Sequence, residues 1–290
     1  MAAETYDRTT QDVGNIVALE HVNVRVPDQQ LAILFYVVGL GLTRDPYLMT
    51  GLENMWINIG QQQFHLPTGD PQVVRGHVGL VISDLDELPG RLAAVKRELK
   101  GTKFDYAVED KHIRVVSPWG NAIRCHAPGP AFGEMTLGMP YVEFAVEPGA
   151  ADGIARFYRA ALGAQAAVVR NGGGAAARVT VGPHQELIFR ETAAAIPPYD
   201  GHHLQVYIAN FSGPHRWLKE RGLVTEESNW YQYRFQDLVD PETRRVLFTI
   251  EHEVRSLRSP LYLRPLVNRN PAQRQPTYQR GRDAFVPGMG

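Results

Sequence analysis

Three histidines begin segments whose residue pattern is typical of a β-strand. His203 begins residues 203–208, in which polar or aromatic positions alternate with aliphatic ones, and His21 and His77 begin comparable segments. An imidazole at such a position is either a hydrogen-bonded structural residue or a metal ligand. A single case favours the structural interpretation. Because the pattern recurs along the chain, a role as metal ligand is as plausible as a structural role for His77 and His203.

Helix and strand patterns follow each of these segments. Ser-Gly-Pro interrupts the chain at residues 212–214, and residues 215–222 predict a short helix that ends on glycine. Residues 77–90 have the same order of strand, polar break and helix start. Near the N-terminus, residues 31–38 predict a helix that ends at a Gly-Leu-Gly sequence, and residues 55–60 and 63–66 predict two further strands.

The order of elements recurs four times. Tyr141 follows His21 by 141−21 = 120 residues, and His203 follows His77 by 203−77 = 126 residues. A repeat of this kind indicates duplicated structural units. Each unit also closes on a predicted strand, at residues 63–66, 121–125, 185–189 and 246–251. The Pro- and Gly-rich residues 127–136 predict the boundary between the two halves.

Length and composition predict a globular protein with about two domains. The 290 residues are 44% hydrophobic and 21% charged, and the formal net charge of −1 gives no general attraction to nucleic acid or to a membrane. The single cysteine, Cys125, cannot form an internal disulfide, and the polar N-terminus lacks the pattern of a secretion signal. We therefore expect a cytoplasmic protein without nucleic-acid or membrane partners.

The four units, the Phe-Tyr…Leu-Gly sequence that ends a helix in units 1 and 3, and the Pro-Trp-Gly-Asn-Ala-Ile segment at residues 118–123 resemble the vicinal oxygen chelate superfamily. That superfamily includes glyoxalase I, bleomycin-resistance proteins and extradiol ring-cleavage dioxygenases. The resemblance implies an α+β fold with two tandem barrels built from four βαβββ units. It predicts an N-terminal domain at residues 15–128, a C-terminal domain at 137–253, and an extended Arg- and Pro-rich arm at 254–290.

The resemblance also implies that metal ligands come from the first and last strands of each unit. If neighbouring units pair, the N-terminal barrel offers His21, His65, His77 and Arg124, and the C-terminal barrel offers Tyr141, Glu186, His203 and Glu251. The guanidinium in the first set would place a fixed positive charge beside the metal. We therefore favour the set with two carboxylates, namely Glu186, His203 and Glu251, with His21, His65 and His77 as the alternative.

Further candidates have catalytic or substrate-contacting roles. They are Tyr141, Glu143 and His202 as catalytic residues, and Tyr207, Tyr231 and Tyr233 as pocket residues. The register at the last strand is open, because a shift would turn His252 or Glu253 inward in place of Glu251. His65 has a second possible role, in which it hydrogen-bonds a substrate oxygen.

The predicted function is that of an enzyme that uses Fe, Mn, Zn or Ni to act on a small, oxygen-chelating substrate, either aromatic or aliphatic. The two-barrel size favours extradiol-type dioxygenation. Two alternatives stay open: a glyoxalase-type isomerase, lyase or epimerase with the metal in the N-terminal barrel, and a metal-free binding protein of the bleomycin-resistance type. For residues 254–290 we expect an arm that packs across its own barrels or across a partner subunit of a homo-oligomer.

Overall fold

The computed structural model describes residues 6–46, 48, 53–172 and 174–268, and it contains the four predicted units. Each unit consists of a strand, a helix and three further strands. Units 1 and 2 contain β1 Ile16–Asn23, α1 Gln29–Ala32 continued by a π-helix at Ile33–Gly39, β2 Thr43–Arg44, β3 Asn54–Ile59 and β4 Gln62–Pro67, then β5 Gly76–Val81, α2 Leu88–Val95, β6 Asp105–Val108, β7 Ile113–Val116 and β8 Ala122–His126.

Units 3 and 4 repeat this order in the second half of the chain. They contain β9 Gly138–Val146, α3 Ala151–Leu162, β10 Ala166–Asn171, β11 Gly174–Gly182 and β12 Gln185–Glu191, then β13 His203–Ile208, α4 Ser212–Lys219, β14 Val224–Asn229, β15 Gln232–Val239 and β16 Val246–Ser256. The predicted α+β fold class is confirmed. β16 continues past residue 253, where we predicted the arm to begin, so Arg255 belongs to the sheet.

The helix α3 shows how the sequence sets these elements. Its buried residues include Ile154, Phe157, Tyr158 and Leu162, whose spacing places them on one face against the sheet. The helix ends because Gly163 adopts a left-handed conformation with φ of 63°, and its N–H donates back to the Arg159 carbonyl. A residue with a Cβ is strained in that conformation, which explains the Leu-Gly sequence at the helix end.

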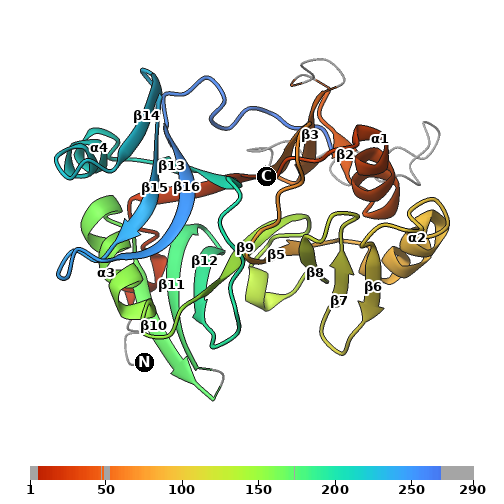
Figure 1. Cartoon of the computed structure of the whole chain (residues 1–290), viewed down its shortest axis with the longest axis horizontal. Helices are drawn as coiled ribbons and strands as arrows, with labels where there is room; N and C mark the ends of the chain where they lie inside the picture. The colour runs from red at the N-terminus through yellow and green to blue at the C-terminus, as the bar shows by residue number, and fades with distance from the viewer. Residues whose placement is uncertain (1–5, 47, 49–52, 173, 269–290) are drawn as a thin grey trace, which may run out of the picture.

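The sixteen strands form two eight-stranded sheets, in the orders β14-β15-β16-β13-β1-β4-β3-β2 and β10-β11-β12-β9-β5-β8-β7-β6. The first sheet joins units 1 and 4, and the second joins units 2 and 3; we call them the 1–4 sheet and the 2–3 sheet. They occupy the upper and lower parts of Figure 1. We expected neighbouring units to pair, but each sheet takes one unit from each half of the chain. A repeat identifies the units without saying which first strands pair, because every first strand offers a similar edge.

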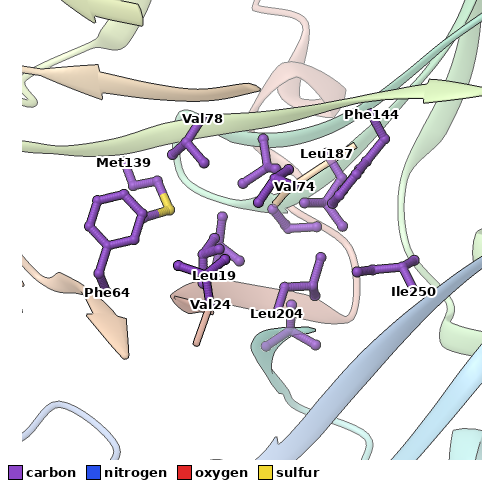
Figure 2. Close-up of a cluster of buried hydrophobic side chains, with 14 of the residues drawn as sticks. Leu19, Val24, Phe64, Val74, Val78, Met139, Phe144, Leu187, Leu204 and Ile250 are labelled. Atoms are coloured by element: carbon purple, nitrogen blue, oxygen red, sulfur yellow. The ribbon is translucent and has the colours of Figure 1, made fainter. Parts of the chain in front are cut away.

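A shared hydrophobic core lies between the two sheets. Figure 2 shows side chains of both sheets in one buried cluster, among them Leu19 and Leu204 from the 1–4 sheet and Val78, Phe144 and Leu187 from the 2–3 sheet. All five are at most 1% exposed. Burial of this apolar surface holds the two sheets together and fixes which face of each strand points inward.

The opposite face of the 1–4 sheet carries polar side chains. On β13, His203, Gln205 and Tyr207 alternate with the core residues between them, and all six positions of the strand are buried. On β16, Glu251 and Glu253 share this face while Ile250 and His252 point into the core. Because side chains alternate across a strand, one strand supplies both the core and a row of polar groups.

The chain continues from β16 across the polar face of the 1–4 sheet to β3 (Figure 1). Tyr262 packs edge-on against Tyr207, with ring centroids 4.8 Å apart. At the far end, the side chain of Asn268 exchanges two hydrogen bonds with the backbone of Gly60. Residues 257–268, which we call the C-terminal segment, therefore pack across the protein's own sheet.

The rest of the predicted arm, residues 269–290, lies outside the described residues. Its proposed role in a homo-oligomer stays a prediction. Within the part of the chain that the structure describes, no helix combines the length and the apolar character needed to span a bilayer.

Candidate metal centre

Three histidines converge on the polar face of the 1–4 sheet. His21 lies on β1, His65 on β4 and His203 on β13, and one ring nitrogen of each lies within 4.8 Å of the others. Among the described residues, this is the one group of three potential ligand side chains that meets this distance. Imidazoles in such proximity are suited to hold a divalent transition metal.

A β-bulge orients His21. The pairing of β1 with β13 shifts between Leu19 and His21, so the extra residue, Glu20, lies on the same face as His21. The Glu20 carboxylate is 2.9 Å from Nδ1 of His21, while Nε2 is buried and has no hydrogen-bond partner within the described ranges. A carboxylate at Nδ1 favours the tautomer whose Nε2 carries a free lone pair.

The surroundings of His203 contain further buried atoms without partners. Nδ1 of His203 lies 3.5 Å from Glu251 Oε1, and Nε2 lies 3.9 Å from Glu253 Oε2 without a hydrogen bond. Next to it on the strand, both amide atoms of Gln205 are buried and unpartnered. Since buried polar groups are normally hydrogen-bonded, four such atoms on one sheet face indicate a place for an ion or a polar ligand.

His65 is held more firmly than the other two histidines. Its Nδ1 lies 2.7 Å from the Asn23 amide nitrogen and its Nε2 lies 2.6 Å from Asn54 Oδ1. The ring also stacks on Trp56, with centroids 3.8 Å apart and planes 12° from parallel. His65 must therefore lose one of its two asparagine hydrogen bonds before it can coordinate a metal. His21 and His203 can coordinate one without such a loss.

A chain of alternating charges borders the histidines. Arg255 bonds Glu20 at 3.1 Å and Glu253 at 2.5 Å, and Arg234 bonds Glu253 at 2.6 Å and Glu251 at 2.7 Å. Three carboxylates against two guanidinium groups give this network a formal charge of 2 − 3 = −1. The excess negative charge favours a cation on this face.

Burial shifts the pKa values of the three histidines in the direction that metal binding needs. Desolvation lowers the pKa of His65 to about 2 and lowers the pKa values of His21 and His203 well below the usual range. Desolvation also raises the pKa values of Glu20 and Glu253, against the opposing effect of the neighbouring arginines. At neutral pH the imidazoles are therefore uncharged, as metal ligands must be.

The structure separates residues that each predicted ligand set had grouped together. Glu186 lies on β12 of the 2–3 sheet and pairs with Arg178, so it does not join His203 and Glu251. His77 likewise lies on β5 of the 2–3 sheet, away from its predicted partners. Both predicted sets assumed that neighbouring units pair. The pairing of units 1 and 4 instead brings together His21, His65, His203 and Glu251.

The predicted catalytic pair Tyr141 and Glu143 also lies on the 2–3 sheet. Arg190 donates to both Glu143 oxygens, at 2.9 and 3.0 Å. The Tyr141 ring lies over Gly79, where an added Cβ would come within 2.3 Å of it, and its hydroxyl lies 2.9 Å from His126. On that face, Glu143 is therefore paired with Arg190, and Tyr141 fills the space over Gly79 and contacts His126.

The remaining predicted residues are separated as well. His202 points away from the centre, with Nδ1 2.6 Å from Asp200 and its ring stacked near Phe144 in the core. Tyr233 packs on Phe211, and Tyr231 is 40% exposed. Tyr207 alone among the predicted pocket residues lies at the centre, where its hydroxyl donates to Glu20.

Sequence reasoning missed several residues of the centre, in particular Glu20, Gln205 and Arg234. The alternation of Glu251, Glu253 and Arg255 along β16 was a usable signal, because residues two apart share a face. The Glu20 bulge had no such signal, since the alternation pattern places Glu20 on the face opposite His21.

Comparison with solved structures supports the fold. Glyoxalase I from Zea mays matches with a TM-score of 0.57 and 14% identity, over 82% of this chain and 92% of that one. A Bacillus subtilis subsp. subtilis str. 168 protein, proposed by its name to be a dioxygenase, matches with a TM-score of 0.55 and 12% identity, over 84% and 86%. The chain thus has the fold that its resemblance to the vicinal oxygen chelate superfamily implied. No protein-family model and no curated protein matches the sequence.

Proposed function

We propose that this protein is a divalent-metal-dependent enzyme that acts on a small substrate with two neighbouring oxygens. The metal is held by His21 and His203 together with the carboxylate of Glu251, and His65 is the third imidazole beside it. The observation that supports this most directly is the convergence of three imidazoles, two of which, His21 and His203, have a buried Nε2 without a hydrogen-bond partner among the described residues. When bound, a divalent metal polarises the chelated oxygens as a Lewis acid.

The surrounding residues have defined tasks in this proposal. Glu20 keeps the proton on Nδ1 of His21, and Arg234 holds the carboxylate of Glu251 by a 2.7 Å bond. The amide of Gln205, which has no hydrogen-bond partner in the described part of the chain, would hydrogen-bond a substrate oxygen. Tyr141, Glu143 and His202 have no part in it, because they lie away from the centre.

For the reaction we favour extradiol-type dioxygenation. His21, His203 and Glu251 form a set of two imidazoles and one carboxylate, which is typical of non-haem Fe(II) oxygenases. His65 would then hydrogen-bond the substrate in place of one of its two asparagine contacts.

The second candidate is a glyoxalase-type isomerase or lyase. It is favoured if His65 coordinates as well and the bound metal is Zn or Ni, because imidazole ligands suit both metals and a Lewis acid is sufficient for this chemistry. The fold shared with Zea mays glyoxalase I is compatible with this reading.

Metal identity and oxygen uptake separate these candidates. The protein is purified without chelators, its metal is measured by plasma mass spectrometry, and oxygen consumption is recorded with catechol as probe. Bound iron with catechol-dependent oxygen uptake supports dioxygenation. Bound Zn or Ni without oxygen uptake supports the isomerase or lyase. Absence of metal even after reconstitution contradicts both and leaves a metal-free binding protein.

A further inference from the structure

A cavity of about 270 Å³ lies beneath the C-terminal segment, next to the candidate metal centre. Glu20 and Tyr207 line it from the 1–4 sheet, and Tyr262 and Arg264 line it from the segment. Most of the other lining residues are apolar, including Val17, Leu19, Met135, Pro183, Leu261 and Leu266. An apolar cavity of roughly 150 Å³ is enough to bind benzene, so this one has room for a small substituted aromatic.

Most buried polar groups around the cavity are committed to the fold. The side-chain Oε1 of Gln62 accepts a hydrogen bond from the backbone N–H of Met139. The side-chain amide of Gln185 accepts from the backbone N–H of Leu19 and donates to its carbonyl oxygen. These groups shape the cavity wall and leave little capacity for a ligand.

Arg264 is the exception. Its Nη2 donates to Asp45 Oδ2 at 2.8 Å, whereas its Nη1 is buried and has no hydrogen-bond partner among the residues that the structure describes. A buried guanidinium N–H without a partner costs free energy, and a carboxylate is the group whose geometry matches this donor best.

We propose that the cavity binds a small molecule with an apolar, aromatic body and a carboxylate group that Arg264 recognises. Glu20 lines the cavity and also contacts His21, so the ligand lies beside the metal centre. Binding of the carboxylate itself does not need the metal. Only the ligand's role as substrate rests on the function proposed above.

Calorimetric titration with two probes tests the recognition. Benzoate carries the carboxylate, and benzamide is its uncharged counterpart. Titrations use the full-length protein, once metal-free and once after metal reconstitution. We expect Arg264→Gln to weaken benzoate binding about tenfold or more while benzamide binding stays unchanged, because one charge-assisted hydrogen bond is lost. Arg258→Gln is the matched control, since Arg258 is exposed on the same segment and does not line the cavity.

Two further variants keep the result interpretable. Arg264→Lys retains a charge for the buried Asp45, so the protein stays folded while the planar donor is lost, and we expect benzoate binding weaker than in the wild type. Val17→Phe fills the cavity and should weaken both probes. Unchanged benzoate affinity in both Arg264 variants, or no binding of benzoate to the wild type, overturns the proposal. A protein that binds benzoate as expected but holds no metal contradicts the proposed function and leaves the carboxylate site intact.

Discussion

The two sheets have the same architecture but carry different chemistry at equivalent positions. The first and last strands of units 1 and 4 bring His21, His65, His203 and Glu251 together, whereas those of units 2 and 3 carry His77, Arg124, Tyr141 and Glu186. In the 2–3 sheet, Glu186 pairs with Arg178 and the Tyr141 ring fills the space over Gly79. The fold alone therefore does not make a metal centre. The first and last strands must also carry side chains whose lone pairs are available to a metal.

Solvent exposure sharpens the difference. The side chains of Arg178 and Arg190 in the 2–3 sheet are 45% and 35% exposed, whereas those of Arg234 and Arg255 in the 1–4 sheet are 22% and 10% exposed. Water screens the first pair and hardly screens the second. Electrostatic effects are therefore expected to be strong in the 1–4 sheet and weak in the 2–3 sheet.

The largest effect on stability is expected from breaking the buried charge network. Arg255→Met leaves the Glu20 and Glu253 carboxylates with fewer partners in a buried site, which should cost about 3–5 kcal/mol of unfolding free energy. Arg190→Met breaks a more exposed pair with Glu143 and should cost about 1 kcal/mol or less. Urea denaturation of both variants measures the difference, and equal losses would contradict the contrast between the sheets.

The loss of stability at low pH should end at a lower pH for His65 in the 1–4 sheet than for His77 in the 2–3 sheet. Burial lowers the pKa of His77 to about 4 and that of His65 to about 2. The unfolded chain, with a histidine pKa near 6.5, takes up these protons first. Stability is therefore complete above about pH 6.5 and falls as the pH drops towards the folded-state pKa.

Single variants separate the two contributions. In urea denaturation of the metal-free protein between pH 6 and 4.5, His77→Asn and His65→Asn should each reduce the slope of unfolding free energy against pH by up to about 1.4 kcal/mol per pH unit. Below pH 4, only His65→Asn should still reduce it. A slope that neither variant changes between pH 6 and 4.5 would show that these imidazoles are not buried in their neutral form.

A smaller effect is expected from single hydroxyl groups. Tyr207→Phe removes the donor to the buried Glu20 and should lower the unfolding free energy by about 1–2 kcal/mol. Tyr141→Phe removes the contact with the half-buried His126, which water can replace, and should cost less. Thermal unfolding of both variants tests this order, and the reverse order would contradict it.

The sequence predicted the units because their signals are local. Alternation marks β13, and Leu162-Gly163 marks the end of α3 through the left-handed conformation of the glycine. Which units share a sheet is decided by how residues far apart in the sequence, such as Leu19 and Phe144, gather in one core, which leaves no local pattern.

The same limit explains the errors at the site. The individual candidates His21, His65, His203 and Glu251 were all recognised, but they were assigned to two different barrels. Glu186 entered the favoured set because its charge suited a metal, and its pairing with Arg178 could not be seen from sequence. Glu20 was overlooked because a bulge reverses the face that alternation assigns to it.

Metal content in three matched variants tests the central claim most directly. His21→Ala and His203→Ala remove imidazoles of the proposed centre, whereas His77→Ala removes the residue at the equivalent position of the 2–3 sheet. All three are purified without chelators, reconstituted with the same metal and measured by plasma mass spectrometry. We predict near-stoichiometric metal in the wild type and in His77→Ala, and loss of metal in both His21→Ala and His203→Ala. Metal lost only in His77→Ala, or bound equally by all three, would contradict the account.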